Sequence, residues 1–522
     1  MQSNFRIFSG RYFLYLIFTV VLLSVAVSCR QHGISGVVLV EGGYIQGTVG
    51  KDMTVFKGIP FAAPPIGELR WKAPQPVEKW DGILMTTEFA KAPVQATDDM
   101  GSISEDCLYL NIWTPAKSDD EGLPVMVWIY GGGFSQGATS YSYSDGEALA
   151  RRGVIVVSIA YRVGYLGFLA HPALSGENEE GVSGNYGLLD QIAALQWIQR
   201  NINAFGGNPD NVTLFGQSAG GISISMLCAS PLAKGLFRRA ISESGGSFSA
   251  GREDSYPGEN MRTLAMAEKA GERYAETLGV RTSDELRNLD YSVFARPYNA
   301  TGGAWPNIDG YVIPDDQYRL YESGNFNDVD ILIGYNSDEG ASFAEKESDG
   351  YIRSVHERFG EYADELLNAY PLLGGDTVNK SARDLLRDAS FGWHTWTWAC
   401  LQTEKGKSNV FMYYFDQHPA AQDRTMESEI GSPHGYEVGY VFQHADNCLQ
   451  GDDVLNRQIG AYWTNFAKTG NPNGCNLPEW PQFTSAGHQV MYLTGKGCHA
   501  GPVPDEESLK VLDRYFAWRR NR

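Results

Sequence analysis

The chain has 522 residues, of which 43% are hydrophobic, 20% are charged and 12% are aromatic, and its formal net charge is −20. This composition predicts a globular protein with a sizeable apolar core and excludes collagen-like and disordered chains. Because the chain is strongly acidic and has no basic stripe, we do not expect it to bind nucleic acid, whose phosphates attract lysine and arginine.

The N-terminus has the pattern of an export signal. Two arginines precede an apolar run at residues 13–27, and small residues then lead to Cys29. The run is shorter than the roughly 20 apolar residues of a membrane span. The stretch resembles a bacterial lipoprotein signal, so we predict that residues 1–28 are a signal peptide and that Cys29 becomes the lipidated first residue. Ala26 stands where such signals usually carry leucine, which leaves ordinary cleavage and secretion as the alternative.

No internal repeat or linker divides the rest of the chain, so we expect residues 30–522 to form a single domain. Three continuous apolar runs of strand length, residues 125–130, 154–159 and 212–215, indicate strands buried on both faces. Residues 188–204 carry apolar side chains at spacings of three and four, which predicts an amphipathic helix. This alternation predicts an α/β fold with a large, mostly parallel sheet flanked by helices.

Weaker patterns add shorter elements to this scheme. We expect strands at residues 38–40, 47–49, 55–56, 240–242, 330–334, 410–415 and 490–493, and helices at residues 261–278 and 507–519. The whole therefore predicts one large sheet with helical insertions.

The third apolar run is followed by Gly216-Gln217-Ser218-Ala219-Gly220. The pattern G-x-S-x-G between a strand and a helix is typical of a nucleophile elbow, which presents a serine hydroxyl at the edge of the sheet. Such a pattern is common by chance, and the alternative is a simple glycine-rich turn. Its place between strand and helix favours Ser218 as a nucleophile.

A glycine run follows the first apolar strand. Gly131, Gly132 and Gly133 leave backbone N–H groups free to face a ligand, although a flexible loop would have the same sequence. Together with the N–H of Ala219, the groups of Gly132 and Gly133 are candidates for an oxyanion hole, in which one donor is worth roughly 2.7–4 kcal/mol. We expect this loop beside Ser218.

Several longer segments resemble the type-B carboxylesterase family, which also contains the cholinesterases. They are residues 56–62 (FKGIPFA), 64–70 (PPIGELR), 104–111 (SEDCLYLN), 184–191 (GNYGLLDQ), 201–209, 216–220 and 463–470 (WTNFAKTG). The resemblance covers residues 38–520 and implies an α/β-hydrolase fold and hydrolysis of a small-molecule carboxylic ester without metal or organic cofactor.

The resemblance also points to an acid and a base that follow the serine in the chain. The family's acid lies in a G-x-N-x-D-E-G segment, here residues 334–340, and corresponds to Glu339; the residues alone do not choose between it and Asp338. The family's histidine lies in an H-G-Y-E segment, here residues 434–437, and corresponds to His434, with His444 as the alternative. The expected triad is Ser218, His434 and Glu339.

Two departures from the family concern the segment before Cys107. The family cysteine at this position normally bridges to one upstream, and no cysteine stands at residues 91–95. Cholinesterases carry a tryptophan that stacks on quaternary ammonium in this loop, and residues 96–103 contain none. The sequence therefore disfavours a cholinesterase.

Cysteine usage and aromatic residues allow weaker predictions. Six cysteines remain after Cys29, which is compatible with disulfides in an oxidising compartment; a bridge is plausible among Cys448, Cys475 and Cys498. No cysteine or histidine cluster has the spacing of metal ligands, so we expect no metal site. Aromatic candidates for the substrate pocket are Phe134, Trp305 and Tyr311.

Other functions on the same fold stay open at this point. An amidase or a carbohydrate-linked esterase, for example a feruloyl or acetyl esterase, would use the same triad. A non-catalytic binding protein is a further alternative, because the family includes adhesion relatives without the serine. The presence of Ser218, Glu339 and His434 favours the enzyme.

Overall fold

The computed structural model describes residue 34 and residues 36–296, 304–342, 348–372, 377–418, 431–444 and 453–522. Cys29 and Cys448, which carry two of the sequence predictions, lie outside these ranges. In the described part no helix is both long and apolar enough to cross a membrane.

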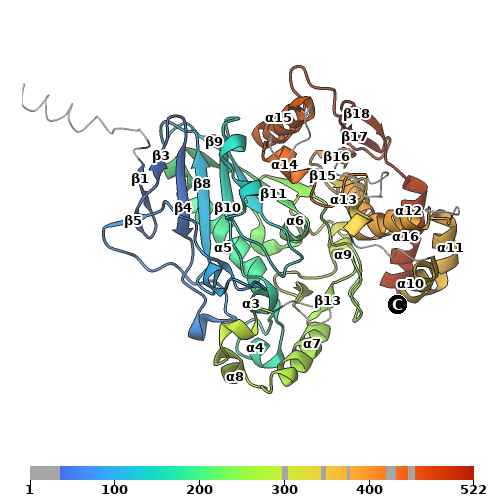
Figure 1. Ribbon diagram of the computed structural model, residues 1–522, viewed down its shortest axis with the longest axis horizontal. Coiled ribbons are helices and arrows are strands. Elements are labelled where there is room, and N and C mark those ends of the chain that lie inside the picture. The colour runs from blue at the N-terminus through green and yellow to red at the C-terminus, as the bar shows by residue number, and fades with distance from the viewer. Residues whose placement is uncertain are drawn as a thin grey trace, which may run out of the picture.

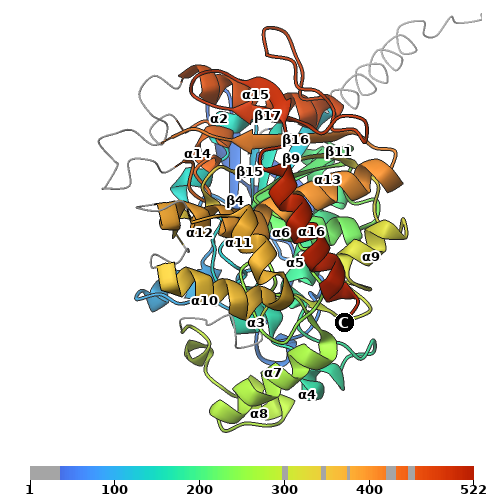
Figure 2. The same ribbon diagram turned by 90° about the vertical axis from the view of Figure 1, so that its right-hand side faces the viewer.

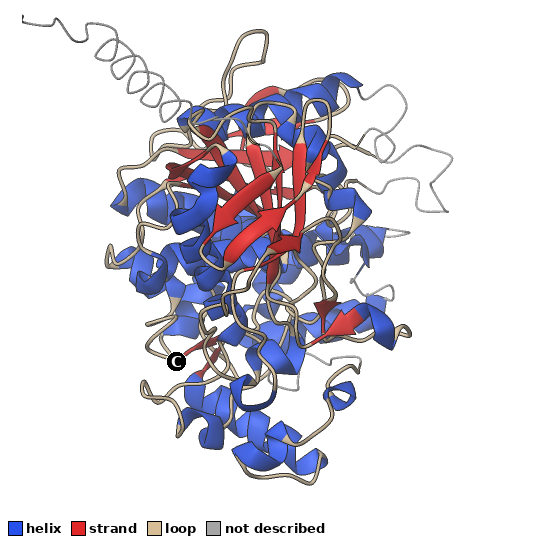
Figure 3. Ribbon diagram, turned by 90° about the vertical axis from the view of Figure 1, so that its left-hand side faces the viewer, coloured by secondary structure: helices blue, strands red, loops and turns tan. Residues whose placement is uncertain are grey.

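A large twisted sheet forms the centre of the molecule, and Figure 3 shows it in red in the upper half, with most helices gathered below it. Its strands, in spatial order, are β18 (His499–Pro502), β17 (Gln489–Leu493), β16 (Val410–Phe415), β15 (Asp330–Asn336), β12 (Arg239–Glu243), β11 (Gly207–Gln217), β9 (Leu123–Ile129), β10 (Ile155–Ile159), β8 (Tyr109–Thr114), β4 (Thr54–Pro60) and β3 (Thr48–Val49). The strands from β17 to β10 run parallel, and both edges are antiparallel. The structure confirms the predicted α/β fold.

Helices cover both faces of this sheet. Figure 2 shows α15 above the sheet and α5, α6 and α13 below it. The longer helices are α5 (Tyr186–Asn201), α6 (Ala219–Ala229), α7 (Leu264–Thr277), α10 (Ser348–Phe359), α11 (Ala363–Ala369), α12 (Thr377–Arg387), α13 (Trp393–Lys405), α15 (Asp453–Thr469) and α16 (Glu506–Arg520). Every residue of β10, β12 and β16 is buried, because parallel strands packed between two helical layers meet apolar side chains on both faces.

Short helices and three small strand groups complete the fold. The short helices are α2 (Glu147–Ala150), α3 (Gly164–Phe168), α4 (Pro172–Ser175), α8 (Ser283–Arg287), α9 (Gln317–Glu322) and α14 (Val438–Val441). The strand groups are β1 (Val37–Val40) with β2 (Gly43–Gln46) and β5 (Ile83–Met85), β6 (Ala92–Pro93) with β7 (Ile103–Ser104), and β13 (Arg262–Thr263) with β14 (Asn307–Ile308). These three strand groups are separate from the large sheet.

Some boundaries differ from the sequence prediction for local reasons. The helix expected at 188–204 ends at Asn201 and continues as a 3-10 turn to Phe205, where Gly206 adopts a left-handed conformation with φ of 79° and stops it. The helix expected from residue 261 begins only at Leu264, because the Thr263 side chain accepts a hydrogen bond from the Met266 N–H and caps it.

The cysteines of the described residues form no disulfide. Cys107, Cys228, Cys400, Cys475 and Cys498 are free thiols. The Cys498 Sγ donates instead to Gln458 Oε1 at 3.2 Å, so the C-terminal bridge considered above is not formed between Cys475 and Cys498.

Candidate active site

Ser218 occupies the sharp turn between β11 and α6. Its backbone has φ of 56° and ψ of −126°, a conformation that costs a residue with a side chain on the order of 1–3 kcal/mol. Two backbone hydrogen bonds hold the turn: the Ser218 N–H donates to Glu243 O at 2.8 Å, and the Ile222 N–H donates to Ser218 O at 2.8 Å. The strained turn of a nucleophile elbow is therefore present at Ser218.

The glycines on either side of Ser218 are required by close packing against β9. A Cβ atom at Gly220 would lie 1.9 Å from the backbone oxygen of Ile129, and one at Gly216 would lie 2.6 Å from the same atom. Neither separation is possible without moving the strand or the helix. The elbow can thus form only with glycine at both positions.

The glycine loop after β9 lies directly against the elbow. A Cβ atom at Gly131 would lie 3.0 Å from the Ser218 Cβ. Gly132 and Gly133 have positive φ values of 106° and 61°, which glycine adopts readily. Ala219 is the first residue of α6, so its N–H has no acceptor within the helix and points out of the helix N-terminus. Gly131 therefore brings the loop with two of the candidate oxyanion donors, Gly132 and Gly133, against the elbow that carries Ser218 and Ala219.

Glu339 follows β15 and is completely buried. Its Oε1 accepts hydrogen bonds from the Asn336 N–H at 2.7 Å and from the Ser244 hydroxyl at 2.5 Å. Its Oε2 contacts His434 Nδ1 at 2.5 Å. With Oε1 held by two donors, the carboxylate orients the imidazole through Oε2.

His434 is placed between the acid and the elbow. Its Nε2 lies 3.2 Å from the side-chain Nε2 of Gln217, the residue that precedes Ser218. An ionised carboxylate can only accept, so the ring proton is on Nδ1, facing Glu339, and Nε2 is the basic nitrogen. Phe391 stacks on the ring with a centroid distance of 4.7 Å, from a π-helical turn at Asp388–Gly392. This arrangement leaves the basic nitrogen on the side of Ser218.

The surroundings raise the pKa of His434 above its usual value of 6.5. Burial alone would lower this pKa, but the negative charge and hydrogen bond of Glu339, with a contribution from Glu437, outweigh it. The imidazolium is thus stabilised where a proton from Ser218 would arrive.

Two further glutamates lie buried beneath this pair. Burial raises the pKa of Glu243 to about 8 and that of Glu437 to about 7. Trp463 Nε1 donates to Glu243 Oε1 at 2.8 Å, and Asn336 donates to Glu437 Oε2. The Glu243 Oε2 and Glu437 Oε1 atoms have no hydrogen-bond partner among the described residues. Sequence reasoning gave neither glutamate a role, although Glu437 stands in the same short motif as His434.

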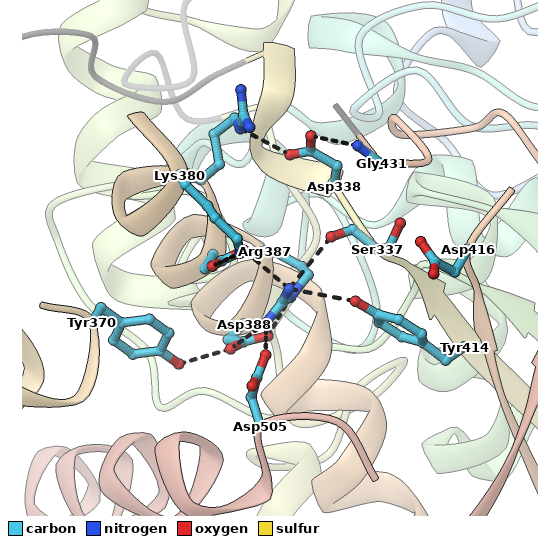
Figure 4. Close-up of polar contacts among 12 residues, drawn as sticks. Ser337, Asp338, Tyr370, Lys380, Arg387, Asp388, Tyr414, Asp416, Gly431 and Asp505 are labelled. Carbon is cyan, nitrogen blue, oxygen red and sulfur yellow. Dashed lines mark hydrogen bonds and ion pairs between the residues drawn. The ribbon is translucent and has the colours of Figure 1, made fainter. Parts of the chain in front are cut away.

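Asp338, the neighbour of Glu339, contacts other partners. Its carboxylate accepts from the Gly431 N–H at 3.1 Å (Figure 4). It also pairs with Arg383 Nε at 3.2 Å. It therefore joins the acid loop to the segment that leads into His434. It does not contact the imidazole in any described interaction.

A buried arginine supports the same loop. Figure 4 shows Arg387 among Ser337, Asp388 and Asp505. Its guanidinium donates to Ser337 O at 3.3 Å, to the Asp388 carboxylate at 2.7 and 2.9 Å, and to Asp505 Oδ2 at 2.7 Å. Tyr370 OH donates to the second Asp388 oxygen at 2.8 Å. The acid loop is thus linked to α12 and to the residue before α16.

His444, Phe134 and Trp305, the other residues that the sequence suggested for the site, make contacts outside the pair of His434 and Glu339. His444 Nε2 contacts the backbone oxygen of Asp145 at 3.2 Å, away from Glu339. Phe134 is fully buried, and its ring packs against Phe168 and Trp305 at centroid distances of 5.1 and 4.8 Å. Trp305 is half-buried and packs on Phe134.

Tyr311 is half-buried at the edge of the core. Within the described residues no group of three or more His, Cys, Asp and Glu side chains could hold a metal ion.

Sequence reasoning missed the groups that hold the acid and the base. Ser244 and Gln217 contact Glu339 and His434, and Phe391 stacks on the histidine. Gln217 could have been suspected from its place beside Ser218. Ser244 and Phe391 reach the site only through folding, and no local pattern marks them.

Comparison with known proteins identifies the family of this chain. Residues 35–511 match the sequence model of the carboxylesterase family. The chain is 36% identical to fumonisin B1 esterase of Sphingopyxis macrogoltabida, over 88% of this chain and 87% of that protein. It is 36% identical to cholinesterase of Mus musculus, over 85% of this chain and 80% of that protein. It is 35% identical to para-nitrobenzyl esterase of Bacillus subtilis (strain 168), over 88% of this chain and 94% of that protein. The chain belongs to the carboxylesterase family and is an ester hydrolase with the α/β-hydrolase fold.

Proposed function

We propose that this enzyme hydrolyses carboxylic esters through a triad of Ser218, His434 and Glu339 and an acyl-enzyme intermediate. The observation that carries the proposal is the position of His434, with Nδ1 on the buried Glu339 and Nε2 beside the elbow of Ser218. A general base placed in this way contributes about 10²–10⁴-fold to the rate.

The reaction follows from this geometry. His434 Nε2 takes the Ser218 proton while Oγ bonds to the ester carbonyl carbon, and the N–H groups of Gly132, Gly133 and Ala219 bind the oxyanion. The C–O bond to the alcohol breaks as His434 returns the proton to the leaving oxygen. Water, deprotonated by His434, then attacks the acyl-enzyme, and the acid is released as the bond to Oγ breaks and His434 returns the proton to Ser218. Glu339 orients the imidazole and stabilises its positive charge without taking the proton.

Covalent labelling tests the proposal directly. An activated phosphonate should form one adduct, located on Ser218 by peptide mass spectrometry, in the native protein and not in Ser218→Ala. Hydrolysis of p-nitrophenyl esters should fall by roughly 10⁴–10⁶-fold in Ser218→Ala. A native protein that stays unlabelled would instead support the non-catalytic binding protein.

For the substrate we propose an uncharged aryl, benzyl or alkyl ester rather than a choline ester. Residues 96–103 contain no tryptophan to stack on a quaternary ammonium, and a curated relative is named for a para-nitrobenzyl ester. Rates on p-nitrophenyl esters of increasing acyl length, compared with butyrylthiocholine, would test this preference. Matched anilides would separate an esterase from an amidase, and feruloyl and acetyl sugar esters would test the carbohydrate-linked alternative.

We also propose that the protein is exported and lipidated on Cys29, with residues 1–28 removed. The support is the charged, apolar and small-residue pattern before Cys29. Intact mass of the mature protein, with Cys29→Ser as the control, tests it: unmodified Cys29 or retention of residues 1–28 would contradict the proposal.

A further inference from the structure

The small sheet of β1, β2 and β5 carries apolar side chains on both faces. The inner face holds Val38, Val40 and Ile45, whose exposed fractions are 6%, 5% and 0%. Side chains alternate along a strand, so their neighbours point outward. The outer face is therefore defined by the residues between them.

The outer face is apolar as well. Leu39 is paired with Tyr44 across β1 and β2, and Tyr44 with Ile83 across β2 and β5, so the three side chains form one row. They are 58%, 51% and 51% exposed. Met85, two residues further along β5 and 58% exposed, lies on the same face in the next row, where it is paired with Gln46. We call these four residues the outer apolar face.

This face departs from the usual pattern of a sheet with one side in water. Such a sheet alternates apolar and polar residues, and the outward positions need no apolar side chain for folding. Contiguous exposed apolar surface marks a contact with a membrane or another protein. We therefore expect the outer apolar face to contact a membrane or another protein.

An aromatic cluster borders this face. Trp80 covers the β1–β2 turn so closely that a Cβ at Gly42 would lie 2.1 Å from its ring, and its Nε1 donates to Tyr44 O at 2.8 Å. Tryptophan and tyrosine are the side chains enriched at membrane–water interfaces, where an apolar ring and a polar atom are both accommodated. Tyr44 and Trp80 thus favour a lipid surface as the partner of the outer apolar face.

The chain itself limits where a lipid anchor on Cys29 could lie. The Ile34 N–H donates to Lys117 O at 3.3 Å, which attaches the chain to the body five residues after Cys29. Five extended residues span at most about 18 Å. Ile34 precedes β1 by three residues, and Figure 1 shows β1 and β5 at one edge of the molecule, far from α10 and α16. An anchored Cys29 would hold this edge close to the membrane.

We propose that the outer apolar face lies on the phospholipid surface that holds the lipidated Cys29 and gives the enzyme a fixed orientation there. The inference rests on the proposed lipidation and is independent of the triad. The net charge of −20 gives no attraction to anionic lipid, so the contact is apolar and insensitive to salt. An acyl anchor with a short tether keeps the protein at the surface, and the face decides which side meets the lipid.

Site-specific photo-crosslinking tests the proposal in the full, lipidated chain. The crosslinker p-benzoylphenylalanine replaces Ile83, and a matched protein carries it in place of Ile352, an exposed apolar residue of α10. Both are irradiated in phosphatidylcholine vesicles and in vesicles of phosphatidylethanolamine with phosphatidylglycerol. We expect phospholipid adducts at position 83 in both vesicle types, roughly tenfold above position 352.

A charged variant supplies the second measurement. With the crosslinker in place of Met85, the changes Leu39→Glu and Ile83→Glu should lower the lipid adducts by roughly tenfold, because two large apolar contacts are lost. Hydrolysis of p-nitrophenyl acetate should stay unchanged, since neither residue is near Ser218.

The other outcomes overturn the inference in distinguishable ways. Crosslinked dimers at position 83 would show that a second copy covers the face, and equal lipid adducts at positions 83 and 352 would show that no orientation exists. A mature protein without acyl groups would also overturn it, although hydrolysis would continue. Lipid adducts in a protein that does not react with phosphonate would contradict only the proposed function.

Discussion

Ser218 and the pair of His434 and Glu339 border each other in the site but are held by different contacts. The Ser218 turn is shaped by its own backbone and by the absence of side chains at Gly216 and Gly220. His434 and Glu339 are instead held by side chains from distant segments, including Ser244 and Gln217. A short motif can therefore encode the serine, whereas the acid–base pair depends on tertiary structure.

Among changes that test this comparison, the largest effect is expected from removing the charge of the acid. Glu339→Gln keeps the shape but cannot stabilise the imidazolium or enforce its tautomer, so we expect kcat to fall by roughly 10³–10⁴-fold. Steady-state hydrolysis of p-nitrophenyl acetate measures this change. Asp338→Asn is the matched control and should lose far less activity, since Asp338 pairs with Arg383. Equal losses in the two variants would contradict the assignment of Glu339.

A second change tests the tertiary support of the acid loop. Arg387→Met leaves the buried Asp388 without its cation, so we expect the free energy of unfolding to fall by about 3–5 kcal/mol. Urea unfolding followed by fluorescence measures it. Arg151→Met removes an ion pair whose arginine side chain is 49% exposed, and should cost at most about 1 kcal/mol. Similar losses in both variants would mean that the buried network does not hold the loop.

A single added methyl group should disrupt the Ser218 turn. Gly220→Ala places a Cβ against the Ile129 oxygen and displaces the elbow, so we expect kcat/KM to fall by about 100-fold or more. Gly487→Ala is the control, because its Cβ would lie 3.9 Å from the nearest atom. Phosphonate labelling rates compare the variants, and unaltered labelling in Gly220→Ala would refute the packing argument.

The smallest effect concerns pH. His434 must be neutral to accept a proton and its pKa is raised, so kcat/KM should fall as the pH drops through a value above 6.5. Glu437 contributes to this raised pKa, and Glu437→Gln should move the acid limb to lower pH by less than about one unit. Profiles of kcat/KM against pH measure the shift, with Glu147→Gln, whose side chain is 46% exposed, as the control. A limb that moves to higher pH would reverse the assigned sign.

Sequence patterns predicted the strands of the sheet centre and the elbow well. Strand β16 has the predicted bounds, and β9, β10 and β12 differ from the prediction by at most two residues at either end, because a continuous apolar run of this length is compatible with few structures other than a buried strand. The start of α7 was misplaced, since a threonine cap decides it. The burial of Phe134 could not be predicted either, because a position after a glycine loop does not reveal which way a ring points.

The sequence by itself determined the α/β fold, the glycines of the elbow and the identity of the serine candidate. These properties depend on neighbours along the chain, where apolar runs, turns and missing side chains act locally. Only the tertiary structure distinguished the environment of Glu339 from that of Asp338 and that of His434 from that of His444. Those distinctions depend on which donors and charges folding brings within a few ångströms, and residues nearly a hundred or more positions apart, such as Ser244, Glu339 and His434, meet only in the folded chain.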